Sequence, residues 1–404
     1  NDRLFDLTRN SKMSTDSFFH QIQPKLLTAG NYAALLLILT TPFSTALTTV
    51  ATVLLVVFWL LSAQFKHLPA LYRKQPVPFL AFLLFVYFII GISYSSASFG
   101  EAFRIVGKYR ELILITFLIP FVTEEPFRKR AIIAFVTASV ITLISSYFLF
   151  FCFYFDLVSY TPEDSPSIKS RITHSLFISF FAFYSAHRAA KKNVYFKFWI
   201  VLFLASVHNL FFIVPGRTGQ LIFLLLLVLF SLQRFSKKGV FLSILGGAVF
   251  LVLFLSFSDK AERILDGFSN TYQYFQSDLD DTSTSMGKRL TFWKYTSYLI
   301  AEKPWFGFGT GSYAMEYERI APRTDFMPGN PHNEFLMITA QLGIGGLFLF
   351  LGLLASMLLH TLKLTGEPRW IAQGVLVVLV INSLFNSTFL DHTEGHWFAC
   401  LIAL

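Results

Sequence analysis

The sequence predicts an all-helical protein that crosses a membrane about twelve times. Of its 404 residues, 54% are hydrophobic and only 14% are charged, whereas roughly 25% of the residues in an ordinary soluble domain are charged. The apolar residues fall into long runs, and a membrane-spanning helix needs about 20 such residues to cross a hydrocarbon core about 30 Å thick. The composition therefore excludes a soluble globular enzyme.

Twelve apolar runs separated by polar punctuation are the expected membrane spans. The final run stops at Leu404, well short of a full span, so we expect the natural chain to continue beyond it. The expected spans are 26–41, 44–64, 77–96, 104–122, 131–156, 172–187, 194–214, 218–234, 239–257, 334–360, 370–388 and 394–404.

Basic residues gather on one side of this expected topology. Nineteen of the 33 Lys and Arg residues, but only six of the 24 Asp and Glu residues, lie in the N-terminal segment and in alternate connections. Because cytoplasmic loops carry the excess of Lys and Arg, both termini are expected in the cytoplasm. The net charge of +9 therefore reports topology, and we expect membrane lipids rather than nucleic acid as partners.

One long polar stretch, 258–333, is then expected on the outer side. It divides the chain into an N-terminal bundle of about nine spans (1–257), a large outer loop with helices of its own (258–333) and C-terminal spans (334–404). Residues 288–295 combine basic and aromatic side chains, as expected of an amphipathic helix on or near the membrane surface.

Arginines on the outer side break the charge rule and are candidate ligands. Arg217 follows Pro215 and Gly216 in a tight turn, Arg289 opens the helix expected in the outer loop, and Arg171 opens the sixth span. A guanidinium binds phosphate or carboxylate oxygens through two parallel hydrogen bonds, and free N–H groups at a helix start also favour anions. The alternatives are a snorkelling arginine at the interface or a solvated loop charge.

A second basic group lies near the start of the fourth span. Arg104 and Lys108 are four residues apart on one helical face, and Arg110 follows. They could form a cationic stripe that supports the site, or Glu101 and Glu111 could neutralise them.

His332 is the candidate catalytic residue. We interpret Asn330 as a helix cap and Pro331 as the first helical residue, which would place His332 in the first turn of the tenth span. The positive end of a helix disfavours imidazolium, so a neutral imidazole able to accept a proton is expected. A capping or purely structural histidine is the alternative.

The sequence contains no recognisable metal-binding motif. Both cysteines, Cys152 and Cys400, sit inside apolar runs, which argues against a disulfide framework or a zinc site. Arginines and one histidine on the outer face, without metal ligands, indicate a substrate bearing a diphosphate that arrives in the membrane. The arginines would neutralise the leaving diphosphate, and the histidine would activate an acceptor hydroxyl.

Several motifs resemble the O-antigen ligase and polymerase superfamily. They are the Gly-rich run 303–312, the segments 331–336 and 341–346, the turn 215–219 and the Arg-x-x-x-Trp element 289–293. Residues 382–387, with Asp391 and Glu394, resemble the ligase branch in particular.

The resemblance implies a bacterial inner-membrane glycosyltransferase with a GT-C-like helical fold and a periplasmic loop. The donor would be a polysaccharide on undecaprenyl diphosphate, the acceptor a hydroxyl of lipid A–core, and the transfer would be inverting and independent of metal or cofactor. By position, His332 would be the base, Arg217 and Arg289 would hold the diphosphate, and Arg171 would assist.

Three alternatives to an O-antigen ligase stay open. Two belong to the same superfamily, an O-antigen polymerase and a protein O-oligosaccharyltransferase, and the third is a lipid or glycan transporter. The sequence also leaves open whether Glu334, Asp391 or Glu394 supports the histidine. Glu334 lies close to His332 along the chain, but residues so close on one helix do not face each other.

Overall fold

The computed structural model describes residues 2–158, 165–276, 283–321 and 328–404, with the side chains of the first helix described from Gln21 onward. Helices are the only regular secondary structure in the described ranges, and no strand occurs within them. The all-helical class is therefore confirmed. The elements are α1 (Asp2–Thr40), α2 (Thr45–Leu61), η1 (Gln64–His67), α3 (Leu68–Lys74), α4 (Pro76–Ile90), α5 (Phe99–Lys108), α6 (Glu111–Val122), α7 (Glu125–Tyr154), α8 (Arg171–Ala189), α9 (Phe196–His208), η2 (Asn209–Ile213), α10 (Arg217–Arg234), α11 (Lys237–Phe257), η3 (Asp259–Ala261), α12 (Glu262–Gln276), α13 (Ser285–Glu302), α14 (Tyr313–Ile320), α15 (Glu334–Lys363), α16 (Gly366–Phe385) and α17 (His392–Ala403).

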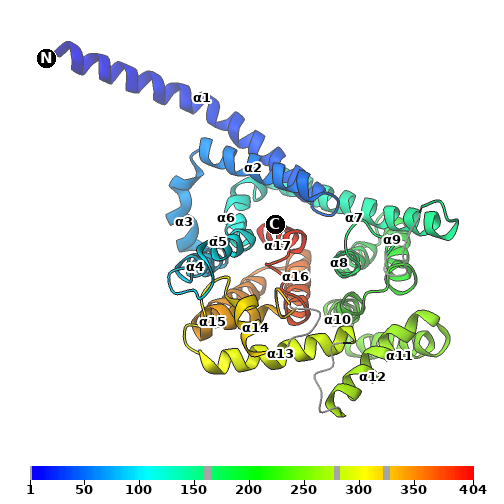
Figure 1. The fold of residues 1–404 in the computed structure, drawn as a ribbon. Helices are drawn as coiled ribbons and strands as arrows, with labels where there is room; N and C mark the ends of the chain where they lie inside the picture. The colour runs from blue at the N-terminus through cyan, green and yellow to red at the C-terminus, as the bar shows by residue number, and fades with distance from the viewer. Residues whose placement is uncertain (1, 159–164, 277–282, 322–327) are drawn as a thin grey trace.

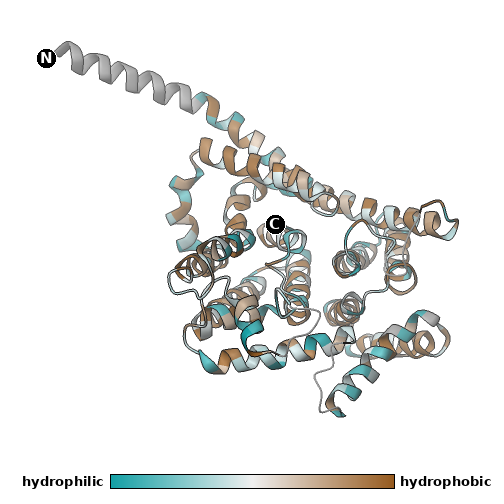
Figure 2. Ribbon diagram, viewed as in Figure 1, coloured by the Kyte–Doolittle hydropathy of each residue, from teal (hydrophilic) through white to brown (hydrophobic). Residues whose placement is uncertain are grey.

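Seven helices in the described ranges are long and apolar enough to cross a membrane, judged by length and composition. An eighth span results if α2 and the following segment 64–74, bent by 72°, count as one. The protein is therefore a multi-span membrane protein. Figure 2 shows the apolar character of these helices, with α11 brown along most of its length.

The remaining expected spans correspond to shorter, broken or more polar helices. The expected span 104–122 is interrupted between Lys108 and Glu111, so that it forms two helices, α5 and α6. α4 has 15 residues and α17 has 12, and α8 is long but is not among the helices that pass the apolar test. The count of twelve and the placement of the loop on the outer side stay predictions.

The C-terminal helix α17 lies in the middle of the bundle (Figure 1). It packs against α6, while α8 packs against α9 and α10, and α15 against α4 and α16. Large side chains such as Tyr109, Phe180 and Phe398 are fully buried between these helices. Segments far apart in the sequence thus surround the short helix that ends the chain.

The expected outer loop contains η3, α12, α13 and α14, and parts of it, 277–282 and 322–327, lie outside the described residues. α13 runs across the bundle in Figure 1 and packs against α15, α14 and α12. The helix expected at 288–295 is confirmed as part of α13, and its position at a membrane surface is untested. The exposed apolar face in this region lies instead on α12, formed by Leu265, Phe268, Tyr272 and Phe275.

A kink in α15 fixes the Gly-rich run 303–312 in place. Gly343 has a φ of 64°, inside the left-handed region, and a Cβ there would lie 2.3 Å from the carbonyl carbon of Trp305. The Gly-rich run binds helix carbonyls beside the kink. The N–H of Phe308 donates to the carbonyl of Ala340 at 3.0 Å, and the N–H of Gly309 donates to the carbonyl of Gln341 at 2.8 Å. The backbone of this run therefore binds the first part of α15. His332 lies just before the start of that helix.

Candidate active site

Arg217 is the first residue of α10, in a turn pressed against α8. A Cβ at Gly216 would lie 2.3 Å from the Oγ of Ser175, and a Cβ at Gly219 would lie 2.4 Å from its Cβ. Only glycine permits this approach, which explains the two glycines that flank Arg217. The turn also passes close to the backbone of Arg171, because a Cβ at Gly216 would lie 3.2 Å from the Arg171 carbonyl oxygen. Arg171 begins α8, so its backbone lies beside the Arg217 turn, while the assisting role expected for its side chain stays a prediction.

α12 covers the guanidinium of Arg217. A Cβ at Gly267 would lie 2.7 Å from the Arg217 Nη1. Asp266, the residue before it, is exposed and forms no ion pair with Arg217 among the described residues, although its charge acts on the guanidinium. Arg217 is thus half-buried and keeps its hydrogen-bonding fork available.

Arg289 lies in the second turn of α13, whose start is capped by the Thr284 hydroxyl accepting from the Gly287 N–H at 2.9 Å. Burial is the main cause that lowers the pKa of Arg289 to about 10, and the charge of Arg217 lowers it further. Two arginines 72 positions apart in the sequence are therefore close enough to repel each other. No described carboxylate lies within ion-pair distance of either one, an arrangement that an added anion would stabilise.

His332 lies before α15 and not inside it, which corrects the sequence interpretation. Asn333 is the cap, and its Oδ1 accepts from the Leu336 N–H at 3.0 Å. Asn330 instead accepts from the His332 N–H at 2.8 Å, closing a turn that holds His332 at a φ of 51°. The sequence favoured Asn330 as the cap because Pro commonly follows a cap. Here the Asn330 side chain instead stabilises a local turn, and the helix begins three residues later.

The imidazole of His332 is placed by two side chains. It stacks nearly parallel to the Phe292 ring, with ring centroids 6.3 Å apart and an angle of 24°, and its Nδ1 lies 3.4 Å from the Oδ1 of Asn386. Burial lowers the pKa of His332, and the charge of Arg289 lowers it further, while the contact with Asn386 raises it. The neutral imidazole expected from the sequence is thus favoured by burial and a nearby arginine rather than by a helix end.

Glu394 holds Asn386 in place. The Nδ2 of Asn386 donates to the Oε2 of Glu394 at 2.8 Å, and the Nδ2 of Asn382 donates to the same oxygen at 2.7 Å. Thr173 donates from its hydroxyl to the other carboxylate oxygen at 3.0 Å. Glu394 is 1% exposed, and among the described contacts it is linked to His332 through Asn386.

Comparison with known proteins now identifies the segment that carries these residues. Residues 200–351 match the O-antigen ligase family. The resemblance seen in the sequence motifs is confirmed for this segment, which contains Arg217, Arg289 and His332.

Two relatives carry the name "Putative polysaccharide ligase". The protein from Rickettsia bellii is 31% identical over 162 residues, 38% of this chain and 36% of the relative. The protein from Rickettsia conorii is 27% identical over 177 residues, 40% of this chain and 38% of the relative. The matched stretch therefore spans little more than a third of each relative.

Asn386, Asn382 and Thr173 lie outside the O-antigen ligase segment and were not singled out as individual site residues from the sequence. Asn382 and Asn386 do fall inside the motif 382–387, which resembles the ligase branch, and that motif was the available indication. Thr173 gave no such indication, because only the packing of α8 against the C-terminal helices brings it to Glu394.

Glu334 and Asp391 do not contact His332. Glu334 accepts from the Tyr109 hydroxyl at 2.9 Å and from the Phe389 N–H at 3.0 Å. Asp391 caps α17, accepting from the N–H groups of Thr393 and Glu394, both at 2.9 Å. Both carboxylates therefore hold the chain segments around the site.

The basic group Arg104, Lys108 and Arg110 does not join Arg217 and Arg289 through any described contact. Arg104 pairs with Glu101, with Nε 2.8 Å from Oε2, and its side chain is 56% exposed. Arg110 lies 3.8 Å from Glu111 and donates to the Gly107 carbonyl at 3.1 Å. The neutralisation by Glu101 and Glu111 considered from the sequence therefore describes Arg104 and Arg110.

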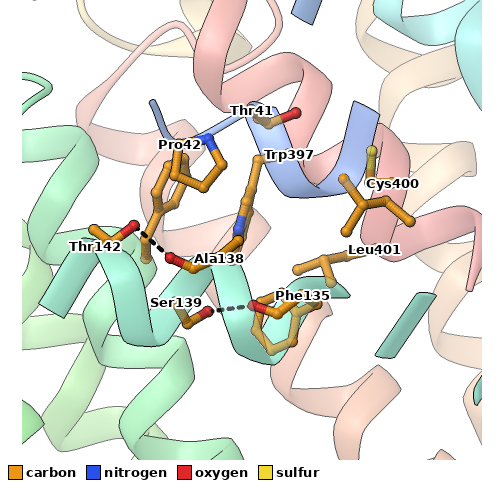
Figure 3. A pocket seen from close by; sticks show the side chains of 11 residues that line it. Thr41, Pro42, Phe135, Ala138, Ser139, Thr142, Trp397, Cys400 and Leu401 are labelled. Carbon is orange, nitrogen blue, oxygen red and sulfur yellow. Dashed lines mark hydrogen bonds between the residues drawn. The ribbon is translucent and has the colours of Figure 1, made fainter. Parts of the chain in front are cut away.

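The pocket in Figure 3 is separate from the candidate site. It lies between α1, α7, α8 and α17, and apolar side chains such as Phe135, Trp397 and Leu401 line it. The hydroxyls of Ser139 and Thr142 turn back to carbonyls of their own helix, at 2.9 and 2.8 Å. None of the candidate site residues lines this pocket. Within the described residues, no three His, Cys, Asp or Glu side chains are grouped to hold a metal ion.

Proposed function

We propose that the protein is an O-antigen ligase, a glycosyltransferase that moves polysaccharide from undecaprenyl diphosphate to lipid A–core. The observation that carries the proposal is the proximity of Arg289 to both Arg217 and His332, which sets two cations without a described carboxylate partner near a half-buried histidine. The family match over 200–351 and the polysaccharide ligase relatives support this choice.

The two arginines would bind the diphosphate of the donor. Arginine presents donors in a fixed planar fork and remains charged, which suits a group whose negative charge grows as it leaves. A dianion between Arg217 and Arg289 relieves the repulsion between them. The site would therefore bind the diphosphate more strongly as its negative charge grows. Arg171, beside the Arg217 turn, would add a third cation.

His332 would act as the general base. Its Nε2 takes the proton from an acceptor hydroxyl, while the hydroxyl oxygen forms a bond to the anomeric carbon of the donor sugar. The bond from that carbon to the diphosphate oxygen breaks, and its electron pair stays on the diphosphate held by the arginines. A single displacement of this kind inverts the anomeric configuration.

The same proposal places the protein in the bacterial inner membrane with its site toward the periplasm and its termini in the cytoplasm. The supporting observation is the bias of Lys and Arg toward alternate connections. The diphosphate and the acceptor would then meet His332 at the outer surface, close to the lipid in which the donor is anchored.

The test is transfer in detergent by the purified protein, with undecaprenyl-diphosphate glycan as donor, lipid A–core as acceptor and EDTA present. We expect glycan on lipid A–core, and none with His332→Ala. Longer glycan on the lipid donor, without any lipid A–core product, would show that the protein is a polymerase and not a ligase. Because detergent removes compartments, product formation also excludes a transporter.

A further inference from the structure

We infer that Asn386 is a positioning residue that holds His332 in the tautomer with the proton on Nδ1, leaving Nε2 free to accept a proton. The inference rests on the proposed function and adds a residue to it. It follows from two contacts that join His332 to Asn386 and Asn386 to Glu394, at the buried start of α17.

The contacts of Glu394 decide which way the Asn386 amide points. An ionised carboxylate only accepts hydrogen bonds, and Oε2 of Glu394 faces the amides of both Asn382 and Asn386, so the group of Asn386 that faces it at 2.8 Å is the NH2 group. The amide oxygen then faces the other way, toward Nδ1 of His332 at 3.4 Å. An amide oxygen is only an acceptor, so Nδ1 must carry the proton to complete this contact.

Glu394 is itself fixed, so the direction of the amide cannot reverse cheaply. Asn382 and Thr173 bind the same carboxylate at 2.7 and 3.0 Å, and Glu394 is almost wholly buried. Turning Asn386 over would bring two oxygens together and leave a buried carboxylate without one of its donors, which is costly. The Oδ1 of Asn386, at the end of α16, is therefore held in a fixed direction as a hydrogen-bond acceptor for His332.

An amide suits this position better than a carboxylate would. A carboxylate beside His332 would raise the pKa of the imidazole and repel the diphosphate that Arg217 and Arg289 are expected to hold. Asn386 orients the ring without adding negative charge. The carboxylate that fixes the amide belongs to Glu394, which is buried and contacts Asn386 on the side away from His332.

The experiment compares Asn386→Ala with Asn382→Ala in the transfer assay. Asn382 binds the same oxygen of Glu394 but does not touch His332, so it is the matched control for loss of support to Glu394. We expect Asn386→Ala to lower kcat about tenfold or more, the effect of one lost hydrogen bond at the reacting group, with KM for the donor nearly unchanged. Asn382→Ala should lower kcat much less.

The pH profile gives a second readout that a purely structural role would not change. The contact with Asn386 raises the pKa of His332, so Asn386→Ala should move the acid limb of kcat/KM to lower pH. Asn382→Ala should leave it in place. The groups that act on the imidazole are Arg289 from α13 and Asn386 from the end of α16, and neither variant changes Arg289.

Asn386→Asp keeps the inference testable if the alanine variant does not fold. A protonated carboxyl can donate to Glu394 through its O–H and present its other oxygen to His332, because two adjacent carboxyl groups share a proton. We expect kcat between wild type and Asn386→Ala. Equal kcat losses and unshifted pH limbs in Asn386→Ala and Asn382→Ala would overturn the inference. Activity retained in His332→Ala would instead overturn the proposed function.

Discussion

Arg289 lies close enough to His332 for its charge to lower the pKa of the imidazole, in addition to the larger effect of burial. The two residues come from different elements, α13 and the turn that precedes α15. One guanidinium therefore serves two purposes in the proposed reaction, since it binds the diphosphate and keeps the base in its neutral form.

The first prediction separates the base from the binding residues. His332→Ala should reduce transfer by about a hundredfold to ten-thousandfold, the usual contribution of a general base, with donor binding largely retained. Arg217→Ala and Arg289→Ala should also weaken donor binding, by about tenfold to a hundredfold for a lost charged hydrogen bond. Binding of labelled donor and initial rates of transfer measure the two effects.

Equal loss of donor binding in all three variants would contradict these separate roles. Arg217→Lys and Arg289→Lys are the matched variants, because they keep the charge and lose the planar fork. Both should remain impaired, and full activity in either would show that a point charge is sufficient.

The second prediction concerns pH. The neutral imidazole is the active form of a base, and the pKa of His332 lies below its usual 6.5. The acid limb of kcat/KM should therefore have its midpoint below pH 6.5, because the decline follows the lowered pKa of His332. Arg289→Gln removes a charge that lowers this pKa, so its acid limb should move to higher pH. An unmoved limb would mean that another group controls the profile.

The third prediction uses the contact between α12 and Arg217. Gly267→Val places a Cβ only 2.7 Å from the Arg217 Nη1, so α12 or the guanidinium must shift. We expect weaker donor binding with the fold retained. Gly246→Ala in α11 is the control, because nothing lies within 4 Å of its Cβ position. Unchanged donor binding in Gly267→Val would show that α12 does not restrict Arg217.

The fourth prediction concerns the kink of α15. Gly343→Ala forces a side chain into a left-handed conformation and into the backbone of Trp305. It should lower stability by about 1–3 kcal/mol, measured as a lower apparent unfolding temperature in detergent. Gly352→Ala, in the same helix with only Leu80 at 3.9 Å, should be neutral or slightly stabilising. Equal unfolding temperatures for both variants would contradict this role of Gly343.

The fifth prediction tests a basic residue that the structure places in a local pair. Arg104 is 56% exposed and bound to Glu101, and an exposed pair of this kind contributes at most about 1 kcal/mol. Arg104→Gln should therefore leave transfer and donor binding unchanged. A loss comparable to that of Arg217→Ala would return Arg104 to the donor site.

Local sequence patterns were sufficient for the membrane class, the helical fold and the choice of Arg217, Arg289 and His332 as candidates. Hydrophobic runs, the distribution of charge and the chemistry of single side chains are readable from neighbours along the chain, because each depends on composition over a few turns. The motifs likewise indicated the family that residues 200–351 match.

Only the tertiary structure decided how these residues meet. His332 contacts Asn386, 54 positions later, and Asn386 is fixed by Glu394. The turn at His332 depends on the Asn330 side chain, whose Oδ1 accepts from the His332 N–H. The sequence pattern favoured Asn330 as a helix cap instead, and that prediction was wrong. These contacts form because distant segments pack together. The free energy of that packing is shared by many contacts, so no single stretch of sequence predicts it.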